Sequence, residues 1–599
     1  MASNLSAPAS RILALTLFAA ATAAGCGEEA APAAPKLFIY GPGGYASFGN
    51  DAVVPSELAV QTYEGTALLQ YTPSAYSADA GGSLTLPSIN LAGETWMSVE
   101  GFNSDGTLWL GSSPLMSVDG QAVPGTIPVF TGPPNRFFPG YEIGYGDNFD
   151  PISVSTNGDP LGRTSQFVES AGRAGAAIAP APSGKGYYVV GGASYSAGAL
   201  SSLSGNIEWY DPYDGRFKLV TEKGCDGEPV DCAVKLDSPR AFHSANIISG
   251  GRLFVAGGLT TGASGPEATA SVEVFKVSGA TAERVNSGVP FELLTPRAFH
   301  TATLFDDGSL LFVGGFSGSV AAPGTFPTVL EFWDPRNAGD MQESATQLNK
   351  ARAMHSATFV PQRGHGLLVV GGRTNTEVVA DAAIIYKQKN AADFSIQSWS
   401  VGTCAAGSSL CRWGHTATLV ACSEEMPRVM FTGGYAALGT GANSLLVGAS
   451  PIATIGIFNT AWLLASQPAP ADFTRNANIL APDPGLAFGF GSTAAFGLTN
   501  LFTLDNTVPE LRREIKVIDF VVAGGLDASG NPVATGRRIS VDYGTCEPTS
   551  SVAADLTTPR AFATGLRNEG QALIFVGGAG GATGAADWFY GDNFKFATN

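Results

Sequence analysis

Short apolar runs separated by glycine-rich turns make up most of the chain from residue 165 onwards. One pattern recurs there: an arginine, an apolar run, a turn marked by Gly or Asp, and a second apolar run that ends in Gly-Gly. The clearest copies are PRAFHSANIISGGRLFVAGG (239–258), PRAFHTATLFDDGSLLFVGG (296–315) and ARAMHSATFVPQRGHGLLVVGG (351–372). Each copy predicts two antiparallel strands, and the Gly-Gly pair marks a backbone conformation that other residues rarely adopt.

Further copies extend this pattern towards the C-terminus. Weaker ones occupy 172–192, 412–434 and 559–578, and another Gly-Gly pair at 524–525 brings the pairs to seven. A third strand is expected after each pair, at 206–212, 271–277, 329–335, 382–387, 454–460, 537–544 and 586–592. The fourth strand is the least regular, with candidates at 217–221 and 395–400. The chain is therefore predicted to be all-β, in units of four short strands.

The sixth unit departs from the pattern. Arg475 is expected to start its first strand, but the Gly-Gly pair follows at 524–525, much later than in the other units. The excess, 482–513, is interpreted as an insertion between the first and second strands.

These units resemble the kelch repeat, which has four strands, Gly-Gly after the second strand and an aromatic residue with Asp-Pro or similar after the third. The resemblance covers 165–599. It implies a kelch-type β-propeller, similar to the central domain of galactose oxidase, with seven four-stranded blades; six remain open because of the sixth unit. Ring closure would bring 559–599 beside 165–220, with a strand shared between the two ends.

The region before the repeats has its own pattern. Residues 91–114 alternate between apolar and polar positions on either side of a Ser-Asp-Gly turn, which predicts a small β-sandwich over 37–130. The Pro- and Gly-containing stretch 131–164 is then a linker. The sandwich is expected to be a spacer between membrane and propeller, or else a carbohydrate or protein contact module.

The first residues indicate export. Arg11 precedes a short apolar run, and Ala23-Ala24-Gly25-Cys26 resembles a bacterial lipobox, so 1–25 is read as a signal peptide, Cys26 as the lipidated residue and 26–36 as a tether. The alternative is a plain secretory signal with Cys26 free or paired. We expect a lipid-anchored protein of the bacterial cell envelope, periplasmic or at the outer membrane or cell surface, held to the membrane by lipid alone.

Composition narrows the class of partner. The chain has 76 Gly, 35 Phe and 14% charged residues, which suits short strands and tight turns. Its net charge of −18 argues against nucleic acid, because phosphate binding relies on clustered Lys and Arg. We expect a monomer that binds a protein or polysaccharide.

Six cysteines besides Cys26 suggest disulfides in an oxidising compartment. Two pairs share one spacing and the third follows by elimination, although other connectivities stay open: Cys225 with Cys232, Cys404 with Cys411, and Cys422 with Cys546. Zinc is the weaker explanation, because neither short pair has CxxC spacing or a nearby His.

Histidines and arginines recur at fixed positions in the repeat. The four histidines are His243, His300, His355 and His415. A metal cluster is one interpretation, but neighbouring blades would hold these rings too far apart for one ion, so we expect local hydrogen bonds and no metal. The arginines at the start of the first strands could form a cationic, ligand-binding ring at one channel mouth, or each could be held within its own blade. They are Arg173, Arg240, Arg297, Arg352, Arg412, Arg475 and Arg560.

Long connections supply the functional hypothesis. Loops after Gly-Gly, at 258–270, 315–327 and 434–453, share one face with the loops between blades. We expect a membrane-anchored binding or interaction protein that uses this loop-rich face, without a cofactor or assigned catalytic residue. The alternatives are a secreted propeller enzyme, either a carbohydrate-active hydrolase or an oxidase, and a structural envelope protein. A copper oxidase resembling galactose oxidase would need two histidines, tyrosines and a Tyr-linked Cys near the axis, for which this sequence offers poor raw material.

Overall fold

The computed structural model describes most of 173–590 and the strand segments of 36–167. The longest gaps within 173–590 are 401–410, 421–427, 460–482 and 505–511. The described residues form β-strands joined by turns, with a short 3-10 turn at Pro484–Leu486, which confirms the all-β prediction. No helix in this described part of the chain is long and apolar enough to cross a membrane.

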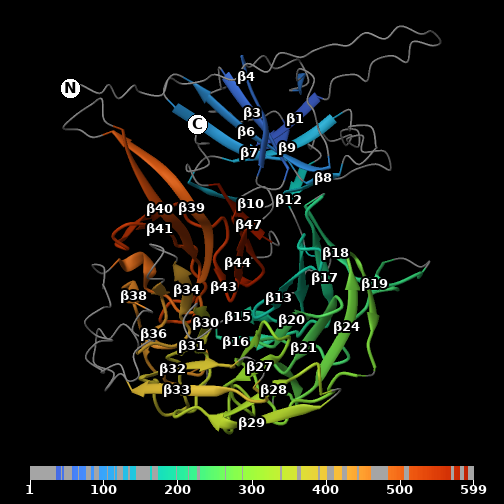
Figure 1. The fold of residues 1–599 in the computed structure, drawn as a ribbon, viewed down its shortest axis with the longest axis vertical. Helices are drawn as coiled ribbons and strands as arrows, with labels where there is room; N and C mark the ends of the chain where they lie inside the picture. Colours follow the sequence, from blue (N-terminus) through green and yellow to red (C-terminus); the bar gives the residue numbers. More distant parts are fainter. Residues whose placement is uncertain are drawn as a thin grey trace, which may run out of the picture.

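Seven small, mainly antiparallel sheets follow one another around a common centre in a propeller-like arrangement (Figure 1). The first sheet contains β13 (Ala177–Pro180), β14 (Tyr187–Val190), β17 (Ile207–Asp211) and β18 (Arg216–Leu219). The second contains β20 (Ser244–Ile248), β21 (Arg252–Ala256), β24 (Val272–Ser278) and β25 (Thr281–Arg284), with β19 (Thr221–Glu222) added in parallel. The third contains β26 (Thr301–Leu304), β27 (Leu310–Val313), β28 (Val329–Trp333) and β29 (Met341–Gln347).

The remaining four sheets have the same order. The fourth sheet contains β30 (Ser356–Val360), β31 (Gly366–Val370), β32 (Asp381–Tyr386) and β33 (Ser395–Ser400), and the fifth contains β34 (Thr416–Val420), β35 (Arg428–Thr432) and β38 (Gly456–Asn459). The sixth contains β39 (Ser492–Leu504), β40 (Arg512–Ala523), β41 (Gly536–Asp542) and β42 (Pro548–Ala553). The seventh contains β44 (Thr564–Arg567), β45 (Leu573–Val576), β47 (Ala586–Phe589) and β10 (Phe137–Pro139). Apolar side chains fill the space between neighbouring sheets: Tyr188 and Val190 of the first, for example, pack with Leu253 and Phe275 of the second.

The seventh sheet takes its last strand from the other end of the chain. β10 pairs with β47 in antiparallel register, Phe137 opposite Phe589 and Pro139 opposite Asp587. Ring closure predicts a shared strand, but one between 559–599 and 165–220. Part of the predicted linker 131–164 therefore belongs to the last sheet.

The Gly-Gly pairs join each sheet to the next. Both glycines of every pair have positive φ, from 60° to 72° for the first and from 90° to 117° for the second, as the sequence predicted. The second glycine donates its N–H to the backbone carbonyl of the residue that opens the following sheet, which we call a hinge bond. The seven hinge bonds are Gly192 to Arg240 (2.8 Å), Gly258 to Arg297 (2.8 Å), Gly315 to Arg352 (2.9 Å), Gly372 to Arg412 (2.9 Å), Gly434 to Phe488 (2.7 Å), Gly525 to Arg560 (2.6 Å) and Gly578 to Arg173 (3.2 Å).

The hinge bonds correct the interpretation of the sixth unit. Phe488, and not Arg475, occupies the position that arginine holds elsewhere, and Arg475 lies outside the described residues. Residues 482–513 are no insertion between two strands. They contain the 3-10 turn, the start of the sheet and much of a long hairpin whose strands, β39 and β40, have 13 and 12 residues.

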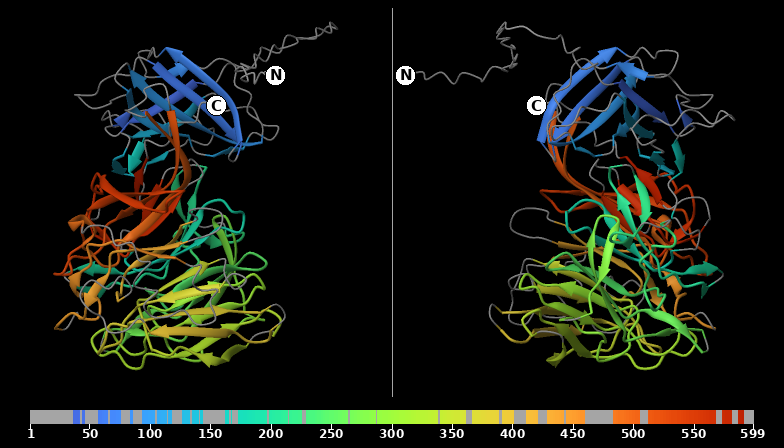
Figure 2. Two further views of the ribbon diagram at one scale, coloured as in Figure 1. Left: turned by 60° about the vertical axis from the view of Figure 1, so that its left-hand side comes forward. Right: turned by 90° about the vertical axis from the view of Figure 1, so that its right-hand side faces the viewer.

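The N-terminal region forms a separate nine-stranded sheet. Its strands are β1 (Lys36–Gly41), β2 (Gly44–Tyr45), β3 (Glu57–Glu64), β4 (Ala67–Ala75), β5 (Ser83–Thr85), β6 (Glu94–Asn103), β7 (Gly106–Ser112), β8 (Met116–Ser117) and β9 (Thr126–Gly132). All nine share one hydrogen-bonded network, and the two layers of a sandwich stay a prediction. Figure 2 shows this sheet, in blue, at one end of the molecule, beside the first and last sheets of the repeat.

The hinge geometry predicts a sharp difference between two glycine substitutions. A Cβ at Gly314, where φ is +60°, would lie 2.3 Å from the carbonyl oxygen of Arg352, which belongs to the next sheet. We expect Gly314→Ala to lower the free energy of unfolding by about 3 kcal/mol or more, because strain and overlap add.

Gly184→Ala is the matched control. Its φ is +75°, but no atom lies within 4 Å of the added Cβ, so only the backbone strain of about 1–2 kcal/mol applies. Urea denaturation of both variants measures the difference. Equal losses would show that the hinge does not restrict the backbone as described.

Candidate functional site

The connections after Gly-Gly cross the inner ends of the sheets. Several fold into two-stranded hairpins: β15 (Ser194–Ser196) with β16 (Ala199–Ser201), β22 (Leu259–Gly262) with β23 (Gly265–Ala268), and β36 (Tyr435–Ala437) with β37 (Ala449–Pro451). The residue after each pair bridges back to the start of its own sheet, as Leu259 does to Ala241 and Phe316 to Ala298. These loops therefore lie over the centre of the ring of sheets.

Apolar side chains from these loops and from the segments that precede the first strands of all seven units meet in one cluster, which we call the axial cluster. Its buried members include Tyr195, Leu259, Phe316, Met354, Trp413, Tyr435, Leu445, Leu446, Leu526, Phe562 and Ala579, with Phe242, Phe299 and Phe490 partly buried. Phe242 and Phe299 stack at 4.1 Å between ring centroids, and Phe490 and Phe562 lie 4.7 Å apart. The centre of the loop-bearing end is thus filled by aromatic and aliphatic groups.

Seven residues at the inner rim support this cluster. Each has a left-handed backbone, with φ between 53° and 63°, although five carry large side chains: they are Gly175, Phe242, Phe299, Met354, Gly414, Phe490 and Phe562. Six of the seven, all but Gly175, donate their N–H to the carbonyl of the preceding member, from Phe242 to Gly175 at 2.7 Å through to Phe562 to Phe490 at 3.2 Å. These bonds and the ring packing offset the strain of about 1–2 kcal/mol that a left-handed conformation costs a non-glycine residue.

Polar side chains brace loops of different sheets. Tyr195 donates its hydroxyl to the carbonyl of Gly530 at 2.8 Å, and Tyr435 donates to Leu526 at 3.0 Å. Arg373 donates to the carbonyl of Ser444 at 2.5 Å, and its guanidinium lies 4.6 Å from the ring centroid of Trp413. Burial raises the pKa of Tyr195 to about 12 and also raises that of Tyr435, so both phenols stay protonated at neutral pH.

The six arginines of the predicted ring that the structure describes, all but Arg475, are buried within their units. Each of the six donates Nη1 to the carbonyl of the first glycine of its own pair, for instance Arg240 to Gly257 at 3.0 Å and Arg297 to Gly314 at 2.9 Å. Five also pair with a carboxylate of their own sheet: Arg173 with Glu208, Arg240 with Glu273, Arg297 with Glu331, Arg352 with Asp381, and Arg560 with Asp587. The residues Arg173, Arg240, Arg297, Arg352, Arg412 and Arg560 are at most 5% exposed, so the geometry favours the interpretation in which each is held by its own unit.

The histidines contact the preceding sheet. His300 Nε2 lies 3.0 Å from the hydroxyl of Ser244, His355 Nε2 3.0 Å from that of Thr301, and His415 Nε2 2.9 Å from that of Ser356. At the corresponding place before His243 the chain has Ala177, which has no hydroxyl. Among the described residues, no group of three or more His, Cys, Asp or Glu side chains could hold a metal ion. His365 lies outside them.

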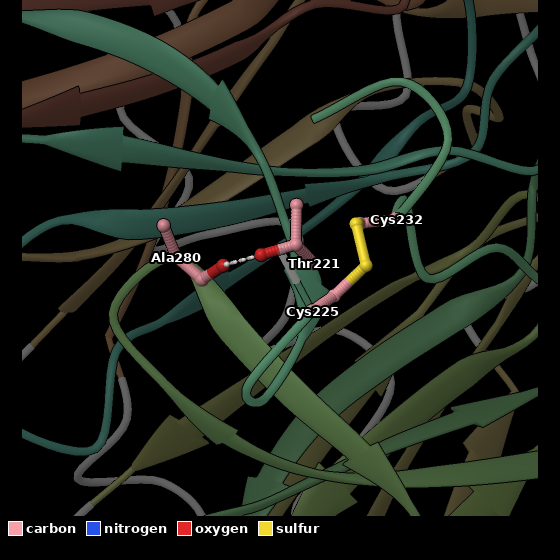
Figure 3. Close-up of a disulfide and its surroundings, with 4 residues drawn as sticks. All are labelled: Thr221, Cys225, Cys232 and Ala280. Atoms are coloured by element: carbon pink, nitrogen blue, oxygen red, sulfur yellow. Dashed lines mark hydrogen bonds between the residues drawn. A yellow bond between two sulfur atoms is a disulfide. The ribbon is translucent and has the colours of Figure 1, made fainter. Parts of the chain in front are cut away.

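The first predicted disulfide is present. Cys225 and Cys232 are bonded beside β19, where Thr221 donates its hydroxyl to the carbonyl of Ala280 at 3.4 Å (Figure 3). Cys411 is part of a disulfide, and so is Cys546. Their expected partners, Cys404 and Cys422, lie outside the described residues, as does Cys26, so those two pairings and the lipidation stay predictions.

Sequence reasoning missed the axial cluster, although the sequence carries two signals for it. A large apolar residue follows Gly-Gly directly in four units, as Leu259, Phe316, Tyr435 and Leu526. Another large apolar residue stands two positions after the repeat arginine, as Phe242, Phe299, Met354 and Phe562. In the repeat pattern both positions fall in predicted strands or loops. Arg373, directly after the fourth pair, is a third signal.

Comparisons with known proteins identify no family. No family model and no curated protein matches the chain. Among solved structures, 159 chains match, one of them described as a novel fungal alcohol oxidase with catalytic diversity among the AA5 family, in complex with copper. It is 13% identical, with a TM-score of 0.42, over 71% of this chain and 75% of that chain. A likeness this distant assigns no activity.

The buried pairs predict a large effect of removing one arginine. Arg297→Ala would leave the carboxylate of Glu331, which is 0% exposed, without its cation. We expect a loss of about 3–5 kcal/mol in the free energy of unfolding. Lys350→Ala is the control, since the Lys350–Glu377 pair is about half exposed and is expected to contribute less than about 1 kcal/mol. Similar losses in urea denaturation would contradict the buried role.

The histidines predict a pH dependence. Burial, with smaller contributions from Arg297 and Arg352, lowers the pKa of His300 and His355 to about 3. Because their unfolded-state pKa is about 6.5, the unfolded chain binds protons first, and stability falls as pH drops from about 6.5 towards 3.

We expect His300→Gln with His355→Gln to make this fall shallower, by up to about 1.4 kcal/mol per pH unit for each residue. Urea denaturation between pH 7 and pH 5 measures the slope. An unchanged slope would mean that these imidazoles are not held neutral by the fold.

Proposed function

We propose that this chain is an extracytoplasmic binding or interaction protein, built on a kelch-type propeller of seven blades and using its loop-rich face. Three observations support the seven blades: seven consecutive sheets, seven hinge bonds that return from Gly578 to Arg173, and a last sheet completed by β10. A closed ring of this kind gives its loops a rigid support.

The axial cluster is the observation that carries the binding role. It fills the centre of the loop-bearing end, and bonds such as Tyr195 to Gly530 tie loops of different sheets together. Catalysis would need convergent polar groups in a pocket, whereas a braced apolar hub suits a surface that presents loops to a partner. The described repeat arginines donate hydrogen bonds within their own units, and His300, His355 and His415 contact hydroxyl groups of the preceding sheet.

The cellular location and the ligand class complete the proposed function. We propose that lipidated Cys26 anchors the chain in the bacterial envelope, that 26–36 is a tether, and that the ligand is a protein or a polysaccharide. The chain would act as a monomer without a cofactor.

A binding screen with charge-reversal variants tests this function. The chain from residue 27 is screened by thermal shift against polysaccharides, envelope extracts and divalent metals, because a ligand of the folded state raises the melting temperature. Glu267→Lys and Glu377→Lys alter exposed loop-face positions. Glu547→Lys is the matched control, at the turn between β41 and β42, at the opposite ends of the strands.

We expect a polysaccharide or an envelope fraction to raise the melting temperature of the native chain and the control, and less so that of the two loop variants. Loss of the shift in the control alone would place binding on the other face. A shift with copper alone, reversed by EDTA, would favour the enzyme alternative.

A further inference from the structure

The strand that completes the seventh sheet, β10, is too short to stabilise the closure of the ring by itself. β10 has three residues, and one of them, Pro139, has no N–H to donate. Each hydrogen bond contributes only about 0.5–1.5 kcal/mol net. The ring of Phe137 adds packing against Phe575 and Phe589, at 5.4 Å and 4.9 Å between centroids. Further contacts must stabilise the closure.

Asn135, just before β10, supplies the first of these contacts. Its N–H donates to the carbonyl of Tyr590 at 2.7 Å, after the last strand. Its own carbonyl accepts from Ala554 at 3.4 Å, and its side-chain oxygen accepts from Arg538 at 3.1 Å, both in the sixth unit. One residue thus joins the end of the N-terminal sheet to the last two units.

Tyr590 fastens the last unit to the N-terminal sheet. Its side chain is 0% exposed, and its hydroxyl donates to the carbonyl of Phe130 at 3.1 Å and lies 2.9 Å from the hydroxyl of Ser112. The neighbouring Trp588 meets the ring of Phe130 edge-on at 5.8 Å. Phe130 and Ser112 belong to β9 and β7, so a buried side chain near the C-terminus inserts against two strands near the N-terminus.

The N-terminal region also contacts the first unit. Leu115 donates its N–H to the carbonyl of Pro212 at 3.1 Å, and Glu94 accepts from the hydroxyl of Tyr213 at 2.9 Å while pairing with Lys185. Apolar residues of both units and of the N-terminal sheet form one core: Tyr63, Trp96, Leu110, Leu115 and Phe130 pack with Tyr210, Phe217, Ile574, Val576, Trp588 and Tyr590. The sheet therefore spans the seam between the first and last units.

We propose that the N-terminal sheet is the clasp that closes the propeller, and that sheet and propeller form one rigid unit. The sheet is then no spacer on a linker, because its removal would expose the core at the seam. This inference does not rest on the proposed binding function. It adds that the loop-rich face has a fixed orientation relative to the N-terminal end of the chain.

Cleavage of the full-length chain tests the clasp. A site-specific protease sequence is inserted within 144–161, between β11 (Tyr141–Ile143) and β12 (Gly162–Thr164), and the purified protein is cut. Gel filtration in increasing urea then reports when the N-terminal fragment leaves the propeller. We expect both fragments to elute together without urea. Separation without urea would overturn the proposal.

Two matched tyrosine variants locate the contact. Tyr590→Phe removes the hydroxyl that meets the N-terminal sheet, whereas Tyr188→Phe removes a buried hydroxyl that donates to Gly279 at 2.9 Å, between the first two sheets. We expect Tyr590→Phe to release the fragment at lower urea, and Tyr188→Phe to leave the release midpoint unchanged. Pairing of β11 with β12 is common to all variants. Equal shifts in the two variants would refute a specific clasp.

Discussion

The hinge bond between the second glycine of each Gly-Gly pair and the residue that opens the next sheet is the constraint on which the other features depend. It requires positive φ at both glycines and leaves no room for a Cβ, as Gly191 illustrates: a Cβ there would lie 2.3 Å from the carbonyl of Arg240. Because the bond sets the position of the next first strand, it also sets the spacing between sheets, and the apolar residues between the sheets are packed closely at that spacing.

The repeat arginine strengthens this hinge from the other side. Its carbonyl accepts the hinge bond, while its guanidinium holds the first glycine carbonyl of its own pair, so one residue links two consecutive units. Phe488 keeps the backbone bond without the guanidinium, which shows that the two functions are separable. In a buried ion pair such as Arg297 with Glu331 the attraction between the charges is offset by the cost of removing both from water, so loss of one partner is more damaging than the net contribution of the pair suggests. These cations therefore serve the architecture of the sheets.

Local repetition made most of the strands predictable. The Gly-Gly pairs, the two strands around the turn and the third strand could be read from the sequence because each unit repeats the same short-range pattern. The sixth unit was misread because Phe488 lacks the arginine that marks the other units and because β39 and β40 are unusually long. The site was less predictable. An arginine at a strand start looks the same whether it faces solvent or a carboxylate two strands away, and only the tertiary fold decides between them.

Closure of the ring also could not be predicted from the local sequence. Nothing in the short segment 137–139 marks it as the last strand of the sheet that contains β47, which ends at residue 589. A ring of similar units has one seam that the repeat itself cannot join, because the two ends meet only when the whole chain is present. Long-range closure is costly in chain entropy, so a large buried contact at the seam is needed to offset that cost. The N-terminal sheet supplies it through Tyr63, Trp96 and Phe130, which explains why these aromatic residues lie outside the repeat and yet belong to its core.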